Sequence, residues 1–509
     1  MSTASRVIKN TGFLYFRIAI TMIVAFWTTR IILNALGEDD FGVYSLVGVV
    51  VSLLGFLNAS LSGATQRFIN FTEGQNDPEA KKIIFNNSLT LHSILAAALT
   101  VLLAVIGVIA FEFFLEIPPD SYFAAKCVYA CMIGTTAISV LNVPYEAEIN
   151  AHEDMVVYAV VGTIDAALKL AIAFIIKSAE SNRLILYGVL MTIVPIVTLI
   201  VLRVYCHRHY SECTIHPVRY FSKSVIKQLS SFAGWNFINT ASSVVAQSGL
   251  NIVINKFFGV ALNAAQGITN QVGGALMNLS SNVEKALNPI IVKREGANQR
   301  EGMLYVSLLG CRMTFFIFSF FSVFLIAQMS PVLHLWLKNV PAWTVLFCQL
   351  QLVRVALELL TRGVHMAIMA QGNIKLYSIC RSVVNILPII LTAWAFYCDM
   401  APYWMYIIWI TTWSILGGCI SLWFARRNIG LSFMTYFETV LKPSMKAILP
   451  TLILIGACKI LVRNISVDIC VTVFAELLFL VLAYRYLFTT FERNELKGLL
   501  DKIMIRIRR

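Results

Sequence analysis

The chain alternates between long apolar runs and short polar connections. The runs show no alternation of apolar and polar residues with period two, which a transmembrane β-strand of about ten residues would require. Each is long enough for a helix of about 20 residues to cross a ~30 Å hydrocarbon core. We therefore predict an all-α integral membrane protein with about fourteen transmembrane helices. The predicted spans are 11–35, 41–65, 84–110, 122–147, 155–176, 184–205, 229–254, 261–284, 304–329, 342–369, 375–397, 402–424, 445–462 and 467–488.

The connection between the first two spans is very short and acidic. It consists of Gly37, Glu38, Asp39 and Asp40, and we predict a tight external corner there. Arg30 lies inside the span that precedes it. The sequence therefore places a cation within an apolar helix, and the role of this cation needs an explanation.

Composition supports a membrane protein and excludes a soluble one. Hydrophobic residues make up 58% of the chain and charged residues 13%, whereas soluble domains average about 45–50% and about 25%. Mean hydropathy is +0.76. The 11 cysteines lie mostly inside apolar runs, without CxxC pairs or a Cys/His cluster at zinc spacing, so they are expected to be core residues. We expect no metal and no cofactor.

The net charge of +13 has an explanation that does not involve nucleic acid. Most of the 40 lysines and arginines fall on alternate connections, on the side of the two termini. Basic loops stay in the cytoplasm, so we predict that both termini are cytoplasmic. The basic and apolar tail is expected to lie against anionic lipids of the inner leaflet.

The predicted spans group into two halves. We expect an N-terminal lobe of six helices at 1–205, a basic cytoplasmic linker at 206–228, a C-terminal lobe of six helices at 229–424, two further spans at 425–490 and a cytoplasmic tail at 491–509. The segment from Ala151 aligns without gaps on that from Ala370, at a shift of 219 residues, and Gly37 matches Gly259 at a shift of 222. Duplication of one lobe explains both shifts, and chance matching of apolar residues is the alternative. A duplicated lobe of six spans predicts a two-lobed transporter.

Charged residues within spans are the most informative feature. A charge at membrane depth costs several kcal/mol unless it faces protein or water. Seven cations lie within predicted spans: Arg17, Arg30, Lys169, Arg312, Arg354, Arg362 and Arg381. Their helical spacing forms stripes, which comprise Gln351, Arg354, Glu358, Arg362 and His365 in one span and Asp165 with Lys169 in another.

Two interpretations of these charges stay open. Asp165 with Lys169, and Glu358 with its arginines, could be ion pairs that join helices. Alternatively the stripes line an aqueous cavity and attract an anion; cations outnumber the acids at this depth, and a phosphate would supply the missing charge. Neutral polar residues suit a sugar in the cavity or hydrogen bonds between helices equally well. They are Asn236, Asn239, Ser243, Gln247, Gln266, Asn270 and Ser281.

Signatures of enzymes are absent from the sequence. It contains no Walker loop, no HExxH and no nucleophile elbow. The predicted external connections are too short to hold an acceptor substrate, as membrane glycosyltransferases, polymerases and ligases do. We therefore expect that the protein is not an enzyme.

Two sequence motifs resemble those of a known protein family. The first comprises Arg30, Leu36, Gly37, Asp40, Phe41, Gly42, Val43 and Tyr44, and the second runs from Ser62 to Phe68. Both resemble bacterial polysaccharide flippases, which move lipid-linked oligosaccharides and belong to the multidrug/oligosaccharidyl-lipid/polysaccharide exporter superfamily. The resemblance implies two lobes in a V, alternating access and a cationic cavity for a polyprenyl-diphosphate headgroup. Arg17 and Arg30 match the arginines that this family has in its first span.

Other members of the superfamily fit less well. The peptidoglycan-precursor flippase has arginines in its second and eighth spans, which this chain lacks at depth. Multidrug and toxic compound extrusion transporters keep acidic residues in the cavity for ion coupling, and the first span here has none. A cation-coupled exporter of drugs or amphiphiles remains the alternative, and a binding or scaffold membrane protein is a third interpretation.

Our expectation is a flippase for undecaprenyl-diphosphate-linked glycans in a bacterial inner membrane, serving O-antigen (lipopolysaccharide) or capsule biosynthesis. Its partners would be the lipid-linked glycan, membrane lipids and polysaccharide polymerase machinery. The residues expected to bind substrate are Arg17, Arg30, Arg354, Arg362 and Arg381, with Lys169 and Arg312 as weaker candidates. Coupling to H⁺ or Na⁺ would use Glu358, Asp165 or His365. The polar lining would be Asn236, Asn239, Gln247, Gln266 and Asn270.

Overall fold

The computed structural model describes residues 3–52, 55–113, 117–180, 182–337, 339–461, 465–490 and 492–494. Every regular element within these ranges is a helix, which confirms the predicted all-α fold. Most of the predicted tail at 491–509 lies outside the described residues. Contacts divide the chain into an N-terminal unit, Gly12–Phe237, and a C-terminal unit, Met1–Thr11 with Ile238–Arg509. The division falls within a helix, and the predicted domain boundaries stay a prediction.

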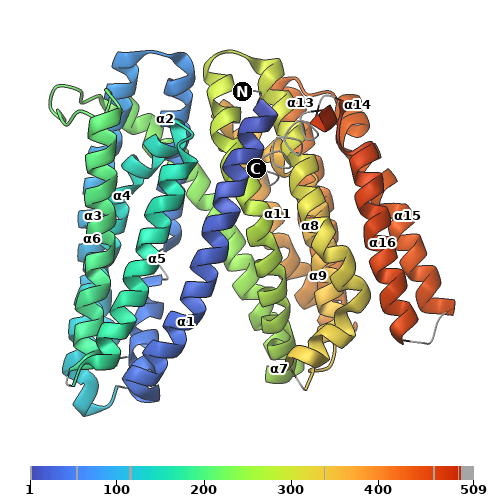
Figure 1. The fold of residues 1–509 in the computed structure, drawn as a ribbon, viewed down its shortest axis with the longest axis horizontal. Coiled ribbons are helices and arrows are strands. Elements are labelled where there is room, and N and C mark those ends of the chain that lie inside the picture. Colours follow the sequence, from blue (N-terminus) through green and yellow to red (C-terminus); the bar gives the residue numbers. More distant parts are fainter. Residues whose placement is uncertain are drawn as a thin grey trace, which may run out of the picture. The chain divides into compact units, whose positions relative to one another are not determined.

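The N-terminal unit is a bundle of long helices (Figure 1). Its elements are α1 (Thr3–Ser52), α2 (Gly55–Gln75), α3 (Pro78–Phe113), α4 (Pro119–Ala151), α5 (Met155–Ser178), α6 (Arg183–His209) and the first part of α7 (Lys223–Gly296). Helix α4 packs against α2, α3, α5 and α6, so it lies at the centre of the bundle. Val128 and Val140 on α4 are fully buried in two of its apolar clusters.

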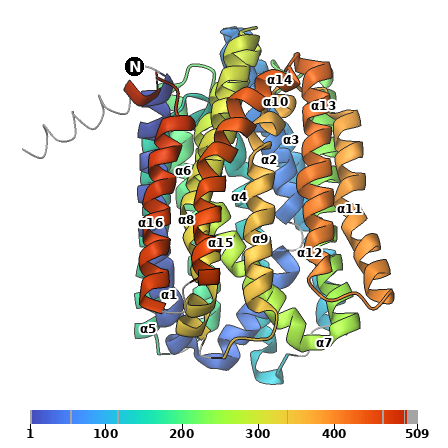
Figure 2. The same ribbon diagram turned by 90° about the vertical axis from the view of Figure 1, so that its right-hand side faces the viewer.

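The C-terminal unit has more interrupted helices. Its elements after α7 are α8 (Arg300–Leu337), α9 (Thr344–Leu359), α10 (Arg362–Gln371), α11 (Lys375–Tyr397), α12 (Trp404–Trp409), the π-helical segment η1 (Ile410–Leu416), α13 (Gly417–Ile429), α14 (Phe433–Tyr436), the π-helical segment η2 (Phe437–Leu441), α15 (Lys442–Leu461) and α16 (Ile465–Tyr486). Helices α15 and α16 pack side by side (Figure 2) and both contact α8. A cluster around Phe347, Tyr406 and Trp409 forms an apolar core of this unit.

The protein is a multi-pass membrane protein. Among the described residues, 11 helices are long and apolar enough to cross a membrane, or up to 12 if α9 and α10 form one span bent by 43°. The second part of α7 does not meet this criterion, because asparagine, glutamine, serine and glycine interrupt its apolar residues. The predicted total of fourteen spans is therefore not confirmed.

Two glycines break helices in the same way. The backbone of Gly37 in α1 has φ 83° and ψ 172°, and that of Gly259 in α7 has φ 77° and ψ −173°. Only glycine adopts this region without strain. The corner at Gly37 is thus a one-residue break, and Asp39 and Asp40 already belong to the next helical segment. Matching conformations at the two residues that the 222-residue shift pairs support a duplicated lobe.

We predict that Gly37→Ala and Gly259→Ala each lower stability by about 1–3 kcal/mol, because alanine is strained at this φ and ψ. A Cβ at either position would meet no atom within 4 Å, so strain rather than a clash causes the loss. Gly274→Ala is the control, since this helical glycine also has open space around it. Thermal unfolding in detergent measures the effect; equal melting temperatures for all three variants would contradict the prediction.

Candidate functional site

A polar cavity lies within the C-terminal unit. Its volume is about 90 Å³. Helices α7, α9, α10, α11, η1 and α13 contribute to its wall, and only one lining residue is a bulky apolar one. The lining residues are Asn239, Ser243, Glu358, Thr361, Arg362, His365, Tyr377, Arg381, Trp413 and Ser421. The cavity therefore brings together five of the predicted site residues from separate stretches of sequence: Asn239, Glu358, Arg362, His365 and Arg381.

Arg354 lies beside the cavity and contacts a carboxylate, a side-chain amide and an aromatic ring. Its Nη1 donates to Glu358 Oε2 at 2.9 Å, and its Nε donates to Gln351 at 2.9 Å. The guanidinium also lies 4.4 Å from the ring centroid of Trp409, where a cation is attracted to the aromatic face. Only 6% of Arg354 is exposed. These contacts hold Arg354 as a structural cation that positions the Glu358 carboxylate.

The predicted polar stripe of this span is divided by a bend. The first part, in α9, contains Arg354 and Glu358, and the second part, in α10, contains Arg362 and His365. Arg362 donates from Nε to Glu284 of α7 at 2.9 Å, rather than to Glu358. The sequence interpretation missed Glu284 because it lies at the predicted end of a span. Its position on a helix with other polar residues was the only available signal.

Arg381 is the cation of this cavity that lacks a carboxylate partner among the described residues. Its Nη1 lies 3.5 Å from the Trp413 carbonyl oxygen. The guanidinium passes so close to Gly417 that a Cβ there would be 1.8 Å from Nη1. A glycine is therefore required for Arg381 to reach its place.

The charges around the cavity do not balance. Three guanidinium groups, on Arg354, Arg362 and Arg381, accompany two carboxylates, on Glu358 and Glu284. The two carboxylates are each paired with one of the first two arginines. One positive charge remains, and Arg381 carries it. An arginine at the centre of a membrane helix costs about 2.5–3.5 kcal/mol. Arg381 is only partly buried, so a ligand anion could reach it and would be stabilised there.

Neutral groups complete the cavity wall. His365 Nδ1 lies 2.7 Å from the Tyr377 hydroxyl, which lies 3.1 Å from Ser421 Oγ. Asn385 donates to Asn239 Oδ1 at 3.2 Å, so this part of the wall is an ordered hydrogen-bond network. Such groups can hold a sugar hydroxyl or a water molecule in a fixed direction.

The other predicted polar residues lie elsewhere. Gln266 is buried and accepts a hydrogen bond from Tyr406, while its amide donates to Asn270 at 3.3 Å. Gln247 is exposed on α7. Asn236 belongs to the N-terminal unit, where it donates to the Ser60 carbonyl at 3.3 Å. Of the predicted polar lining, only Asn239 reaches the cavity.

The N-terminal unit has an arginine in a comparable setting. The Arg17 guanidinium lies 4.4 Å from the ring centroid of Tyr158. It crosses α5 at Gly162, where a Cβ would be 1.9 Å from Arg17 Nε. No carboxylate pairs with Arg17 in the part of the chain that the structure describes. Arg30, further along α1, is exposed and also forms no ion pair with a described residue.

The internal repeat relates these two settings. At a shift of 219, Tyr158 matches Tyr377 and Gly162 matches Arg381; at a shift of 222, Arg17 matches Asn239. Each unit thus has an arginine beside the same repeated tyrosine. In the N-terminal unit this arginine is Arg17 of α1, which crosses α5 at Gly162. In the C-terminal unit it is Arg381 of α11, at the position that matches Gly162, and Asn239 is at the position that matches Arg17. Both units thus have a cation beside the tyrosine, but different helices supply it.

Both weaker candidates are ion-paired. Lys169 Nζ lies 2.8 Å from Asp165 Oδ2, and both side chains are partly exposed. Arg312 is buried, donates to Glu492 Oε1 at 2.8 Å and also donates to the Leu487 carbonyl. Arg312 therefore joins α8 to the segment that follows α16.

Comparisons with solved structures identify the fold. A crystal structure described as MATE in the bent conformation aligns with a TM-score of 0.72 over 84% of this chain and 95% of its own, at 13% identity. An outward-facing multidrug resistance MATE family transporter of the MOP superfamily aligns with a TM-score of 0.70 over 84% and 96%, at 14% identity. A MOP superfamily transporter from Pyrococcus furiosus, whose description reports a binding pocket of reverse polarity, aligns with a TM-score of 0.69 over 84% and 96%, at 14% identity.

The chain therefore has the fold of MATE-type transporters. No sequence profile of a known protein family matches it, and no curated protein matches it. At 13–14% identity, the likeness to these structures shows the fold alone.

We predict that Arg312→Met and Arg381→Met differ sharply in stability. Arg312→Met leaves the Glu492 carboxylate buried without its partner, which costs about 3–5 kcal/mol. Arg381→Met removes no ion pair, so its melting temperature in detergent should equal or exceed that of the wild type. The double variant Arg312→Met/Glu492→Leu is the control, because it removes both charges and should recover most of the loss. Equal destabilisation by the two single changes would show that Arg381 is structural as well.

Proposed function

We propose that the protein is a flippase for polyprenyl-diphosphate-linked oligosaccharides. The observation that carries the proposal is the pair of arginines, Arg17 and Arg381, that lie beside repeat-related tyrosines without a carboxylate partner among the described residues. A diphosphate brings the negative charge that both settings lack, and guanidinium groups bind phosphate oxygens in a bidentate manner.

An apolar groove supports the amphiphilic nature of the proposed substrate. A groove of about 600 Å³ in the C-terminal unit is lined by Cys380, Cys419, Ile420, Leu422, Trp423, Phe424 and Phe433. Phe424 packs edge-on against Tyr377 of the polar cavity, with ring centroids 5.5 Å apart. An apolar surface thus adjoins a cationic cavity, as a substrate with a lipid tail and a charged headgroup requires.

In the proposed mechanism, Arg381 and Arg17 attract the diphosphate, while Asn239, Tyr377 and Ser421 offer hydrogen bonds to sugars. The lipid tail stays in the bilayer, and alternating access exposes the headgroup first on the inner and then on the outer side. Coupling to H⁺ or Na⁺ would use Glu358, Asp165 or His365. Of these, Glu358 and His365 line the cavity directly. The setting would be a bacterial inner membrane with both termini in the cytoplasm, working alongside polysaccharide polymerase machinery.

A cation-coupled exporter of amphiphiles is the second candidate, because one structure with this fold is described as a multidrug resistance transporter. Another is described as having a pocket of reverse polarity that suggests a different function. The fold thus accommodates more than one pocket polarity. The unpaired positive charge in this cavity favours an anionic substrate over a cationic drug.

Deletion of the protein from its host distinguishes the proposed flippase from the alternative exporter. We expect lipid-linked oligosaccharides to accumulate on the inner side and surface polysaccharide to fall, as measured by lipid extraction and by surface glycan staining. Unchanged surface polysaccharide without accumulation would contradict the flippase. Altered drug sensitivity with normal surface polysaccharide would instead support the exporter.

Charge removal at the two arginines tests the site. We predict that Arg17→Gln and Arg381→Gln each reduce flipping of lipid-linked glycan by about tenfold or more, because a hydrogen bond to a charged group contributes about 1.5–3 kcal/mol. Arg381→Lys keeps the charge and should retain part of the activity. Gly417→Ala should imitate Arg381→Gln, since its Cβ would displace the guanidinium.

Arg427→Gln is the matched control for these variants, because Arg427 is exposed at the end of α13 and lies over the Trp423 ring, outside the cavity lining. Its transport should equal that of the wild type. Full transport by both Arg17→Gln and Arg381→Gln, at normal protein levels, would remove the basis for an anion-binding cavity.

A further inference from the structure

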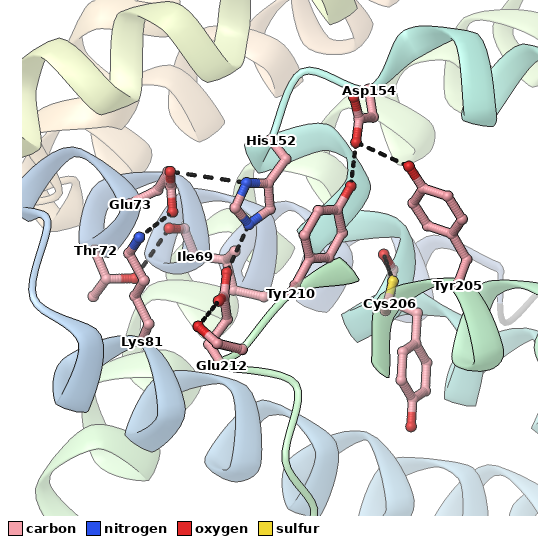
Figure 3. Close-up of polar contacts among 12 residues, drawn as sticks. Ile69, Thr72, Glu73, Lys81, His152, Asp154, Tyr205, Cys206, Tyr210 and Glu212 are labelled. Carbon is pink, nitrogen blue, oxygen red and sulfur yellow. Dashed lines mark hydrogen bonds and ion pairs between the residues drawn. The ribbon is translucent and has the colours of Figure 1, made fainter. Parts of the chain in front are cut away.

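A second polar cluster lies at one end of the N-terminal unit, and it shares no residue with either arginine setting. Figure 3 shows Glu73, His152 and Glu212 converging from three separate segments. Glu73 is in the last turn of α2, His152 follows the end of α4, and Glu212 lies in the segment after α6. One ligand atom of each residue lies within 4.8 Å of those of the other two. The transport mechanism uses none of these residues.

The imidazole of His152 lies between the two carboxylates. Its Nε2 is 2.6 Å from Glu212 Oε1, and its Nδ1 is 3.9 Å from Glu73 Oε1. The ring stacks on that of Tyr210, with centroids 3.9 Å apart and an interplanar angle of 10°. The Tyr210 hydroxyl in turn donates to Asp154. Stacking on Tyr210 thus fixes the plane of the imidazole between the two carboxylates.

The Glu73 carboxylate also has one oxygen directed into the cluster. The other oxygen of Glu73 accepts a hydrogen bond from Lys81, with 2.6 Å between Nζ and Oε2, so Oε1 is directed towards His152.

We propose that Glu73, His152 and Glu212 form a binding site for a divalent transition-metal ion. One imidazole with two carboxylates suits Zn²⁺ and neighbouring first-row ions, whereas Mg²⁺ prefers oxygen ligands and retains its waters. The metal would join the ends of α2, α4 and α6. It would thereby stabilise the end of the unit from which the connection to α7 departs.

The test uses the full-length protein in detergent, stripped with a chelator and titrated with Zn²⁺ or Mg²⁺. We expect about one Zn²⁺ per chain by elemental analysis, a higher melting temperature with Zn²⁺ and no such rise with an equal concentration of Mg²⁺. His152→Asn and Glu212→Gln should each weaken Zn²⁺ binding by about 100-fold or more, since both remove a ligand. His209→Asn is the matched control, because this exposed histidine lies three residues from Glu212 and outside the cluster.

Lys81→Met distinguishes a metal site from a simple network of ion pairs. In a metal site the ammonium group competes with the ion for Glu73, so its removal should tighten Zn²⁺ binding by about tenfold. In an ion-pair network its removal would destabilise the protein, and Zn²⁺ would have no specific effect. Three results would overturn the proposal: no Zn²⁺ retained by the wild type, an equal loss in His209→Asn and His152→Asn, or weaker Zn²⁺ binding in Lys81→Met.

Discussion

The cost of placing a charge at membrane depth governs the arrangement of this protein. Each intramembrane arginine needs a carboxylate, an aromatic face, a carbonyl oxygen or a ligand, because the bilayer offers no water to solvate it. Arg354 has Glu358 and Trp409, Arg362 has Glu284, and Arg312 has Glu492 with the Leu487 carbonyl. The contacts of Arg354 with Trp409, of Arg362 with Glu284 and of Arg312 with Glu492 join separate segments of the C-terminal unit. Arg381 and Arg17 are different because their partners are a carbonyl oxygen and an aromatic ring, respectively.

Glycines allow these two arginines to lie where they do. Gly162 and Gly417 leave room for a guanidinium to cross a helix at a distance that any side chain would prevent. Gly37 and Gly259 have another purpose, since they end one helical segment and start the next without a loop. The two repeats thus share the backbone conformation at Gly37 and Gly259, and each has an arginine beside its repeated tyrosine. The arginine comes from α1 in one repeat and from α11 in the other.

The sequence predicted the features that depend on composition and period. Apolar runs of sufficient length could only be membrane helices, and the spacing of Arg354 and Glu358 correctly placed them one turn apart. The partner of Arg362 could not be predicted, because Glu284 lies 78 residues away and reaches it only through packing of α7 against α10. The bend between α9 and α10 was also missed, since no proline or glycine occurs between Leu359 and Arg362.

The sequence alone determined that this is an all-α membrane protein with cations inside its spans, because hydropathy and helical period are local properties. It also indicated the duplication through two similar shifts. Only the tertiary structure decided which cations are neutralised, since pairing depends on distances of a few ångström between helices remote in sequence. The same reason explains the cluster of Glu73, His152 and Glu212. Its members lie in three separate polar connections, and only the folded chain brings them within reach of a single ion.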